Sequence, residues 1–513
     1  MDTGTTRPRH PAALSFDDVV ALVREQDEAR VVDGDGADDV AVTGITLDSR
    51  RVLPGDVYAA LPGARAHGID FVTQAAAAGA NVVLTDETGA AAVPAGLPAV
   101  VVAQPRGVLG AVSAGIYGHP ARAMRMIGVT GTQGKTTVTR LLDSGLGAAG
   151  IASAVVGTVG TRLAGTDLKT TLTTPEAPDL HGLFALMREE GVTCCAMEVS
   201  SHALVLGRVD GVVFDVAVFT NLGRDHLDFH ADLDDYFAAK ATLFTPGRAR
   251  LGLVNVDDEH GRRLVTTATI PIRTMSTHGR DADWSVTDVE LGPEGSTFTI
   301  RGPGGLSLPA SVALPGDFNV ANALSAVAAA TEAGLDPEQV VAGVAATGGV
   351  PGRLERVSDE TVGFAVYVDY AHKPDALTAV LATLRPVTAG RLIVVIGAGG
   401  DRDRGKRPAM GAIAAAQADL VIVTDDNPRT EQPAEIRAAV MAGVDDVEAS
   451  RRAEVLEVGD RRAAIATALD AAGPGDVVLV AGKGHETGQE IDGVIHPFDD
   501  REVVRELLRG AAR

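Results

Sequence analysis

A glycine-rich loop between a predicted strand and a predicted helix is the strongest chemical signal in the chain. Residues 131–137 read Gly-Thr-Gln-Gly-Lys-Thr-Thr and follow the apolar segment 126–130. Glycines let backbone N–H groups approach phosphate oxygens, and the lysine and threonine behind them can contact the β/γ-phosphates and Mg²⁺. The spacing departs from the G-x-x-x-x-G-K-[ST] pattern. The first glycine of that pattern would stand at position 129, which is Val, whereas the chain has Gly at 128 and 131. We favour a nucleoside-triphosphate site over a solvated glycine turn.

Carboxylate and imidazole side chains follow two other predicted strands. Glu198 ends the apolar segment 193–199, and Asp225 and His226 come shortly after the segment 213–220. The carboxyl ends of parallel strands meet at one edge of a sheet, where ligands bind. Carboxylate oxygens are also the ligands that Mg²⁺ prefers. From these residues alone, a metal site and an ordinary strand end or capped helix start remain about equally supported.

Taken with further segments, these motifs resemble the Mur ligase family. Their order and spacing match along the whole chain, so the resemblance is far more specific than any single motif. The segments are LDSR at 47–50, GTQGKTT at 131–137, TTP at 173–175, MEVSSHAL at 197–204, TNLGRDHLDFH at 220–230, YFAAKATLF at 236–244, VDYAHKP at 368–374, GGDRD at 399–403, DNPR at 426–429 and GKGHE at 482–486.

The resemblance implies an ATP-dependent, ADP- and phosphate-forming ligase that makes an amide bond through an acyl phosphate. DNPR is similar to the signature of the members that add meso-2,6-diaminopimelate to UDP-N-acetylmuramoyl-L-alanyl-D-glutamate (UDP-MurNAc-L-Ala-D-Glu). That step belongs to peptidoglycan precursor synthesis, and so to cell-wall biogenesis, cell shape and cell division. The Arg429 guanidinium can bind the carboxylate that diaminopimelate carries and lysine lacks, and Asn427 adds amide donors beside it. The Asn-Pro pair would also make an ordinary turn.

The resemblance further implies the ATP and metal sites. Lys135 and two Mg²⁺ ions would neutralise the phosphates, and Glu198, His226 and Lys240 would complete the catalytic set. The implied metal ligands are Thr136, Glu198, His226 and Lys240 as a carbamate. The implied ATP contacts are Gly131, Thr132, Gln133, Gly134, Lys135, Thr136, Thr137, Asn322, Arg353, Asp369 and His372.

Lys240 is the residue for which sequence pattern and family resemblance disagree. It lies in an amphipathic Tyr-Phe-x-x-Lys-x-x-Leu-Phe pattern, in which a lysine on a solvent-facing helix surface is the common case. The family instead carries a carbamylated lysine here, which becomes a carboxylate-like anion beside the second Mg²⁺. Carbamylation requires a neutral amine, so a lowered pKa is expected.

Two further residue sets are implied for the other substrates. The UDP-substrate would be contacted by Leu47, Ser49, Thr173, Thr174, Ser200 and Arg208. Diaminopimelate would be contacted by Arg402, Asp426, Asn427, Pro428, Arg429, Gly482 and Glu486. The chain departs from the family pattern at Leu206, where a polar residue is expected, and at Gln133, which replaces an asparagine.

Apolar, Val/Ile-rich segments of strand length alternate with helical patterns along most of the chain, which predicts mostly parallel sheets. We expect three consecutive α/β domains: residues 1–105 for the UDP-substrate, 106–350 as a central P-loop ATPase domain, and 351–513 as a Rossmann-like domain for the amino acid. Residues 283–308 predict an antiparallel excursion, and residues 1–12 a disordered tail.

Composition narrows the classes of partner. Among the 513 residues, 45 Lys+Arg oppose 68 Asp+Glu, and the net charge of −23 argues against nucleic acid as a partner. No apolar run is long enough to insert into a membrane, and no signal peptide is evident. Two adjacent cysteines provide no disulfide framework, which fits a reducing compartment, so we expect a cytoplasmic protein. Separately, we expect a monomer. The scarce cations must therefore be concentrated where ATP and the other anions bind.

Three alternatives remain for the function. A ligase that adds L-lysine at the same step is the nearest, and DNPR speaks against it. A folylpolyglutamate synthase would share the ATP fold but lack the domain that carries LDSR. A P-loop protein that binds nucleotide as a switch would not need the constellation of Glu198, His226 and Lys240.

Overall fold

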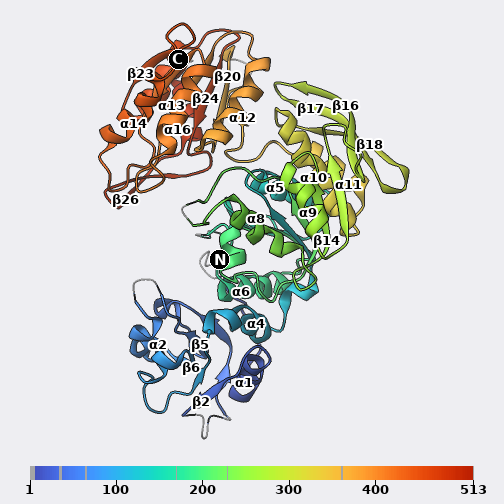
Figure 1. Cartoon of the computed structure of the whole chain (residues 1–513), viewed down its shortest axis with the longest axis vertical. Coiled ribbons are helices and arrows are strands. Elements are labelled where there is room, and N and C mark those ends of the chain that lie inside the picture. The colour runs from blue at the N-terminus through green and yellow to red at the C-terminus, as the bar shows by residue number, and fades with distance from the viewer. Residues whose placement is uncertain are drawn as a thin grey trace. The chain divides into compact units, whose positions relative to one another are not determined.

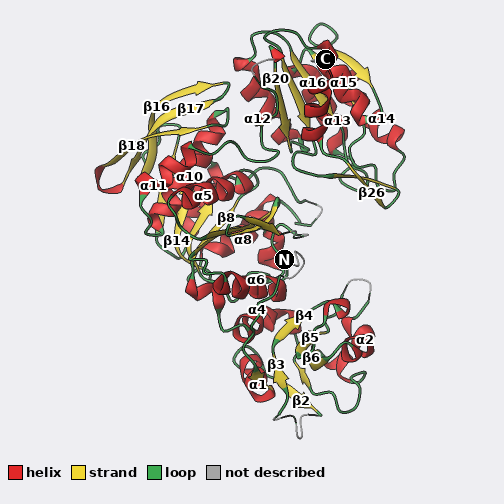
Figure 2. Cartoon of the chain, turned by 180° about the vertical axis from the view of Figure 1, so that it is seen from behind, coloured by secondary structure: helices red, strands yellow, loops and turns green. Residues whose placement is uncertain are grey.

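The computed structural model describes residues 6–33, 37, 39–63, 66–168, 170, 172–227, 229–359 and 362–511 (Figures 1 and 2). Their contacts define two compact units. The first unit is Met1–Leu222, Phe229–Met275 and Ser325–Val340, and the second is Gly223–Asp228, Ser276–Leu324 and Val341–Arg513. Helices α10 (Asp317–Glu332) and α11 (Pro337–Ala345) have residues in both units.

The first unit begins with a five-stranded sheet in the order β2-β7-β6-β5-β4, parallel except for β2. Its alternate residues face two cores: Val57 and Ala59 pack with helices α1 and α4, and Tyr58 and Ala60 pack with α2. The elements are β1 (Leu14–Ser15), α1 (Phe16–Arg24), β2 (Arg30–Val32), β3 (Ala41–Val42), β4 (Gly44–Thr46), β5 (Asp56–Ala59), α2 (Val72–Ala77), β6 (Ala80–Thr85), α3 (Glu87–Ala90), β7 (Ala99–Val101) and α4 (Pro105–Ile116).

The central sheet of the first unit runs β11-β10-β9-β12-β8-β13-β14-β15. From β9 to β15 the strands are parallel and mostly buried, so the carboxyl ends of β8, β12 and β13 meet at one edge. The elements are β8 (Arg125–Thr130), α5 (Lys135–Ala148), β9 (Ser153–Gly157), β10 (Gly160–Leu163), β11 (Thr166–Leu168), α6 (Ala177–Glu189), β12 (Cys194–Glu198), α7 (Ser201–Val205), β13 (Phe214–Phe219), α8 (Leu233–Ala241), β14 (Ala249–Asn255), α9 (Glu259–Thr267) and β15 (Ile272–Ser276).

The second unit contains an antiparallel meander, as the segment 283–308 predicts. Strands β16 (Trp284–Gly292), β17 (Gly295–Gly302) and β18 (Leu306–Val312) pair in sequence order. In β16 and β17 several buried residues alternate with exposed ones, which gives one covered face and one more exposed face.

A six-stranded sheet in the order β19-β20-β24-β21-β22-β23 forms the C-terminal part of the second unit. All pairs but β19–β20 are parallel, and α12–α14 cover one face while α15 and α16 cover the other. This arrangement confirms the expectation of a Rossmann-like domain. The elements are β19 (Glu355–Arg356), β20 (Ala365–Asp369), α12 (Pro374–Leu384), β21 (Leu392–Ile396), α13 (Lys406–Gln417), β22 (Leu420–Val423), α14 (Pro433–Asp445), β23 (Glu454–Glu457), α15 (Arg461–Ala471), β24 (Val477–Ala481), β25 (Gly488–Ile491), β26 (Val494–Pro497) and α16 (Asp500–Ala511).

The segment 6–12 is bound to the first unit, and the expectation of a disordered tail is wrong for these residues. Arg7 is buried and donates to both carboxylate oxygens of Asp56 on β5, at 2.8 and 2.7 Å. The backbone N–H groups of Arg9 and His10 donate to the Glu189 carboxylate of α6, at 2.7 and 2.9 Å. A polar segment is thus held by partners that are distant in the sequence. Residues 1–5 lie outside the described part of the chain.

The helices in the described part of the chain are short. Helix α10 has 16 residues, fewer than the roughly 20 that cross a bilayer. No described helix combines the length and the hydropathy that a membrane span requires.

His181 makes the stability of the first unit depend on pH. It is fully buried on α6, its Nε2 lies 2.9 Å from the Asp210 carbonyl oxygen, and burial lowers its pKa to about 4. The unfolded chain, with a histidine pKa near ~6.5, binds more protons than the fold between those values. Stability is therefore lost as the pH falls from about 6.5 towards 4.

We expect urea unfolding, followed by circular dichroism, to show this loss as a difference between variants. Between pH 7 and 4.5 the wild type should lose about 2–3 kcal/mol more unfolding free energy than His181→Gln. The exposed His10 offers a control, and His10→Gln should keep the pH dependence of the wild type. Equal pH dependence in the wild type and His181→Gln would contradict the assignment.

Candidate functional site

The glycine-rich loop occupies residues 131–134, between β8 and α5. Gly131 has φ +152° and Gly134 has φ +86°, so both need the conformational freedom of glycine. A Cβ atom on Gly131 would lie 1.9 Å from the Thr220 hydroxyl oxygen. The N–H groups of Thr132 and Gln133 donate to the backbone and side-chain oxygens of Asn221, at 2.9 Å each. The end of β13 therefore fixes the loop in front of the N-terminus of α5, where anions are favoured.

Lys135 folds back over this loop. Its Nζ donates to the carbonyl oxygens of Gly131 and Thr132, at 2.8 and 3.0 Å. The side chain is partly exposed and lies against the loop that would cradle phosphates. The strand–loop–helix context predicted from the sequence is confirmed, and the ammonium group is placed at the loop.

Glu198 joins three segments at the end of β12. The side chain is 1% exposed, and its Oε1 accepts from the Thr136 hydroxyl at 2.9 Å and from the Thr158 N–H at 2.8 Å. Its Oε2 accepts from the Thr158 hydroxyl at 3.0 Å. The structure thus brings together Thr136 and Glu198, two of the metal ligands implied by the resemblance. Their hydroxyl and carboxylate oxygens suit Mg²⁺, although no group of three His, Cys, Asp or Glu side chains among the described residues could hold a metal ion.

Lys240 is buried at the phosphate loop and does not lie on a solvent-facing surface of α8. It is 1% exposed, and its Nζ donates to the Gly131 carbonyl at 2.9 Å and the Thr130 hydroxyl at 3.4 Å. The same ammonium lies 4.7 Å from the centre of the Tyr236 ring. The position agrees with the family resemblance and differs from what the local sequence pattern favours. Carbamylation stays a prediction.

Thr173, Thr174 and Ser200 lie beside Glu198. The Thr174 hydroxyl donates to the Glu198 carbonyl oxygen at 2.8 Å and accepts from the Ser200 N–H at 3.2 Å. The Thr173 and Thr158 hydroxyls are 3.1 Å apart. Three of the residues expected to contact the UDP-substrate are therefore gathered around Glu198, which also binds Thr136 at the start of α5.

Arg208, expected in the same set, is held by a glutamate that no sequence motif indicated. Its Nε lies 2.8 Å from the Glu176 carboxylate, and its Nη1 donates to the Thr174 carbonyl at 3.4 Å. Arg106 pairs with the same carboxylate at 3.1 Å and reaches the Leu206 carbonyl at 3.5 Å. Leu206 thus makes a polar contact through its backbone carbonyl oxygen and not through its side chain.

Leu47 and Ser49 follow β4 in the N-terminal sheet, more than 80 residues before the phosphate loop in the sequence. Ser49 is buried, and its hydroxyl donates to Gln74 Oε1 at 3.0 Å. Leu47 packs at the edge of the core formed with α1 and α4. These two residues lie beyond the carboxyl end of β4, the position in a parallel sheet where ligands bind.

His226 and Asn322, two other residues of the implied ATP and metal sites, belong to the second unit. His226 has φ +53°, and its Nε2 lies 3.2 Å from the Asp225 carboxylate, which is also paired with Lys373. Asn322 donates from Nδ2 to Asn319 Oδ1 at 3.0 Å near the start of α10. Asn319 was not predicted from the sequence, because one amide in a helix carries no distinctive spacing.

Asp369, Arg353 and His372 gather at the carboxyl end of β20. Asp369 accepts from two backbone N–H groups at 2.7 Å each, and burial raises its pKa although Arg353 opposes the shift. The Arg353 guanidinium lies 4.5 Å from the centre of the Tyr370 ring. His372 Nδ1 is 2.7 Å from the Tyr370 carbonyl, and burial lowers the pKa of His372 to about 3, which keeps the imidazole neutral.

Asn427 is committed to three partners within the protein. Its Oδ1 accepts from Lys483 Nζ and from the Glu490 N–H, both at 3.0 Å. Because both partners can only donate, the oxygen and nitrogen of the amide are assigned. Its Nδ2 donates to Glu486 at 2.8 Å. One of the amide donors expected beside Arg429 is therefore already used within the protein.

Arg429 is held by the β25–β26 hairpin. It has φ +54°, and its N–H donates to the Glu490 carbonyl at 3.0 Å. Its Nε donates to the Glu490 carboxylate at 3.1 Å and its Nη1 to the Gly400 carbonyl at 2.7 Å. Glu490 therefore positions both Asn427 and Arg429, and no motif pointed to it in the sequence.

The remaining predicted diaminopimelate contacts lie on loops that follow β21, β22 and β24. Gly482 has φ +116°, and a Cβ there would lie 2.5 Å from Asp426 Oδ2, a buried oxygen without a hydrogen-bond partner in the described chain. A Cβ on Gly399 would lie 3.0 Å from Arg429 Nη1 and 3.9 Å from Cγ of the exposed Arg402. Two guanidinium-bearing side chains thus border one glycine. Pro428 packs through its carbonyl against Gly400.

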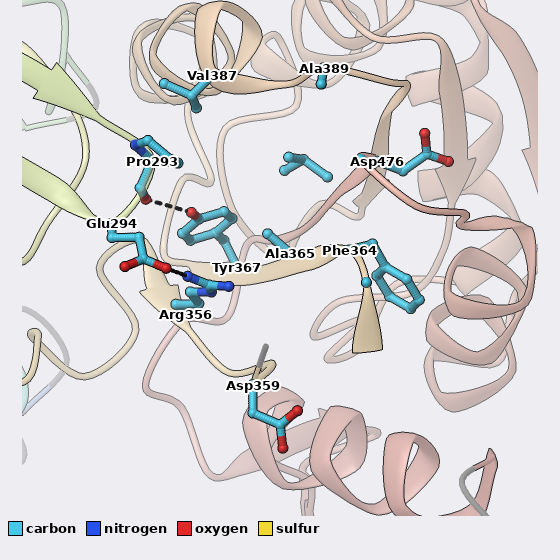
Figure 3. Close-up of a pocket in the computed structure, with 13 residues that line it drawn as sticks. Pro293, Glu294, Arg356, Asp359, Phe364, Ala365, Tyr367, Val387, Ala389 and Asp476 are labelled. Atoms are coloured by element: carbon cyan, nitrogen blue, oxygen red, sulfur yellow. Dashed lines mark hydrogen bonds and ion pairs between the residues drawn. The ribbon is translucent and has the colours of Figure 1, made fainter. Parts of the chain in front are cut away.

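A cavity of about 340 Å³ opens at the opposite, amino-terminal ends of β20 and β24 (Figure 3). The Tyr367 hydroxyl donates to the Pro293 carbonyl at 2.8 Å, and Arg356 pairs with Glu294 there. None of the site residues predicted from the sequence lines this cavity. This cavity is therefore separate from the predicted site residues of the same sheet, which follow the carboxyl ends of its strands.

Comparisons with known proteins agree with this arrangement. Three family models match: the Mur ligase family catalytic domain at 41–117, the Mur ligase middle domain at 129–330, and the Mur ligase glutamate ligase domain at 352–484. The chain is 55% identical over 98% of both sequences to the UDP-N-acetylmuramoyl-L-alanyl-D-glutamate--2,6-diaminopimelate ligase of Streptomyces coelicolor. It is 48% identical, again over 98% of both, to the UDP-N-acetylmuramyl-tripeptide synthetase of Leifsonia xyli.

A solved structure of a UDP-N-acetylmuramoyl-L-alanyl-D-glutamate--2,6-diaminopimelate ligase is also similar. It superposes with a TM-score of 0.66 at 36% identity, and the match covers 92% of this chain and 96% of the other.

The geometry of the phosphate loop predicts a specific loss of nucleotide binding in Gly131→Ala. The added Cβ would collide with Thr220 and force the loop to move. Gly150 offers a matched control, because it also has positive φ (+71°) but nothing lies within 4 Å of the position that a Cβ would take there. MgATP at 100-fold excess over Kd stabilises a binding protein by about 2.7 kcal/mol.

We therefore expect MgATP to raise the melting temperature of the wild type and Gly150→Ala, but not of Gly131→Ala. Differential scanning fluorimetry measures the shift. An undiminished shift in Gly131→Ala would show that the loop does not bind the nucleotide.

Proposed function

The chain belongs to the Mur ligase family, and we propose that it adds meso-2,6-diaminopimelate to UDP-MurNAc-L-Ala-D-Glu at the expense of ATP. The observation that carries the proposal is Arg429, which lies beyond β22 with Asn427 and is joined there by Glu486 from the loop after β24, in a chain 55% identical to a ligase of that name. The products besides the tripeptide would be ADP and phosphate.

The reaction would proceed in two steps. The γ-carboxylate of the D-glutamyl residue attacks the γ-phosphorus of ATP in line, which forms an acyl phosphate and releases ADP. The amine of diaminopimelate then attacks the acyl carbon and displaces phosphate. Such chemistry depends mainly on positioning and on neutralising charge, because several anions meet at one point.

The residues around the phosphate loop suit the first step. Lys135 Nζ and the backbone N–H groups of residues 131–134 that do not donate to Asn221 would bind and orient the ATP phosphates. Thr136 and Glu198 would hold Mg²⁺, with His226 and carbamylated Lys240 as further ligands of a second ion. Bound Mg²⁺ supplies positive charge that neutralises the phosphate oxygens. The remaining proposed ATP contacts are Thr137, Asn322, Arg353, Asp369 and His372.

The UDP-substrate would reach the site from the N-terminal sheet. We assign uridine diphosphate to the residues around Leu47 and Ser49, and the peptide end to Thr173, Thr174, Ser200 and Arg208, which lie beside Glu198. We retain 1–105, 106–350 and 351–513 as the domains that bind UDP-substrate, ATP and amino acid. The substrates place the reaction in peptidoglycan precursor synthesis in the cytoplasm, and we propose a monomer as the active form.

The amino-acid pocket favours diaminopimelate for a chemical reason. The distal carbon of diaminopimelate carries an ammonium and a carboxylate, whereas lysine has only the ammonium. Arg429 can bind the carboxylate through the N–H groups that Glu490 and Gly400 leave free, and Glu486 can accept from the ammonium. Lysine would leave those N–H groups of Arg429 without an acceptor, which costs binding energy.

Arg429→Met tests the specificity. Loss of a charge-assisted contact of about 1.5–3 kcal/mol should lower kcat/KM for diaminopimelate about 10- to 100-fold, while the small activity with L-lysine stays unchanged. Phosphate release in the presence of UDP-MurNAc-L-Ala-D-Glu and either amino acid measures both. Arg452→Met, which removes a surface arginine paired with Asp445, serves as the control. Preference of the wild type for L-lysine, or ATP turnover without the UDP-substrate, would refute the proposed function.

Lys240→Ala tests the carbamate. The variant should lose nearly all activity, because the anion that assists the second Mg²⁺ is gone, and added formate or acetate should restore a measurable part of it. Lys135→Ala is the matched control, since a carboxylate cannot replace a cation at the phosphates. Activity of Lys240→Ala that is insensitive to short carboxylates would argue against a carbamate.

A further inference from the structure

Lys483 is a buried cation that the proposed mechanism does not use. It is 0% exposed and follows β24, in the loop that also carries Gly482 and Glu486. A lysine is almost never fully buried unless its charge is paired, because removing an ammonium from water is costly. Its partners therefore indicate what it does.

Those partners are the two polar side chains of the proposed diaminopimelate pocket. Lys483 Nζ donates to Asn427 Oδ1 at 3.0 Å and to Glu486 Oε2 at 3.1 Å. Asn427 Nδ2 donates to the same Oε2 at 2.8 Å. The three side chains form a closed triangle that links the loop after β22 to the loop after β24.

We propose, resting on the proposed function, that Lys483 is a positioning and specificity-determining residue for the distal end of diaminopimelate. It holds Asn427 and Glu486 in the orientation that receives the amino acid. It also supplies the charge that makes the pocket suit a zwitterion.

The positioning role follows from the atoms used. Both contacts of Glu486 within the triangle engage Oε2, and the side chain is 32% exposed. The carboxylate is thus held by its inner oxygen and presents the outer one. With Lys483 and the Glu490 N–H on Oδ1, the Asn427 amide cannot turn over. The Asn427 Nδ2 group, which donates one N–H to Glu486 within the triangle, is therefore held on the side of the amide that faces Glu486.

The specificity role follows from the charges in contact. Glu486 is paired with Lys483, and Glu490 with Arg429. Asp426 and Arg402 add one further side chain of each sign, so the charges of the pocket balance. A pocket with balanced charges suits a group that carries one ammonium and one carboxylate. Without Lys483 the same pocket gains a net negative charge. It would then bind the bare ammonium of L-lysine relatively better.

Lys483→Met and Lys483→Gln test both roles by steady-state kinetics. In Lys483→Met we expect KM for diaminopimelate to rise at least tenfold, with KM for ATP and for UDP-MurNAc-L-Ala-D-Glu within twofold of the wild type. The ratio of kcat/KM for diaminopimelate over L-lysine should fall at least fivefold. Lys483→Gln keeps a hydrogen-bond donor without the charge, so its KM should rise less while the ratio falls similarly.

Two comparisons separate positioning from general destabilisation. Arg391→Met removes a cation paired with the buried Asp476 at the opposite end of the same sheet, and it should leave the ratio unchanged. Glu486→Gln should make the effect of Lys483→Met on KM smaller, because Lys483 acts through that carboxylate. Additive effects would overturn the positioning role.

The remaining outcomes are also decisive. Equal rises in all three KM values, or an unchanged selectivity ratio in both variants, would overturn the inference and leave the proposed function intact. A wild type that does not use diaminopimelate would overturn the proposed function itself, and the inference with it.

Discussion

The buried carboxylate of Glu198 is the interaction on which the arrangement of the candidate site depends. It accepts hydrogen bonds from the first turn of α5 and from Thr158 after β9, while its own backbone carbonyl receives the Thr174 hydroxyl. A charge that is 1% exposed persists only if several donors replace its hydration. The donors to the carboxylate are Thr136, directly behind the phosphate loop, and Thr158, while Thr174 from the segment expected to contact the UDP-substrate donates to the backbone carbonyl of the same residue. The hydrogen bonds of one glutamate thus hold all three segments at the same strand end.

The cations that are expected to bind anions in this acidic chain are also held in place by neighbouring polar groups. With a net charge of −23, any group that binds an anion has to be held locally. Lys135 is tied to carbonyl oxygens of the phosphate loop, Arg208 to Glu176, and Arg429 to Glu490. Each contact orients its cation, and a carbonyl oxygen does so without cancelling the charge. The positive groups are therefore positioned in advance at the places where phosphate or carboxylate is expected.

Much of the fold could be predicted from the sequence, because it is encoded locally. Runs of Val, Ile and Leu buried on both faces indicate parallel strands, and the loop of residues 131–137 requires a strand before it and a helix after it. The predictions that concern contacts over long sequence distances were less successful. Residues 6–12 are polar and therefore suggested a tail, although Arg7 finds Asp56 49 residues away. Lys240 has the local pattern of a surface residue, and only the folded chain covers it.

Within the candidate site the same division holds. Residue type and spacing by themselves indicated the phosphate loop, because it carries its chemistry within a few neighbouring residues. They left Glu198 open, and only the family resemblance gave the DNPR segment a role. Tertiary structure alone decided that Asn427 donates one N–H to Glu486 and that the Glu490 carboxylate binds Arg429. It also decided that Lys483 is buried against Asn427 and Glu486. The reason is physical: a hydrogen bond between loops that follow different strands depends on the order of those strands in the sheet. Neither the composition nor the spacing of a single segment contains that order.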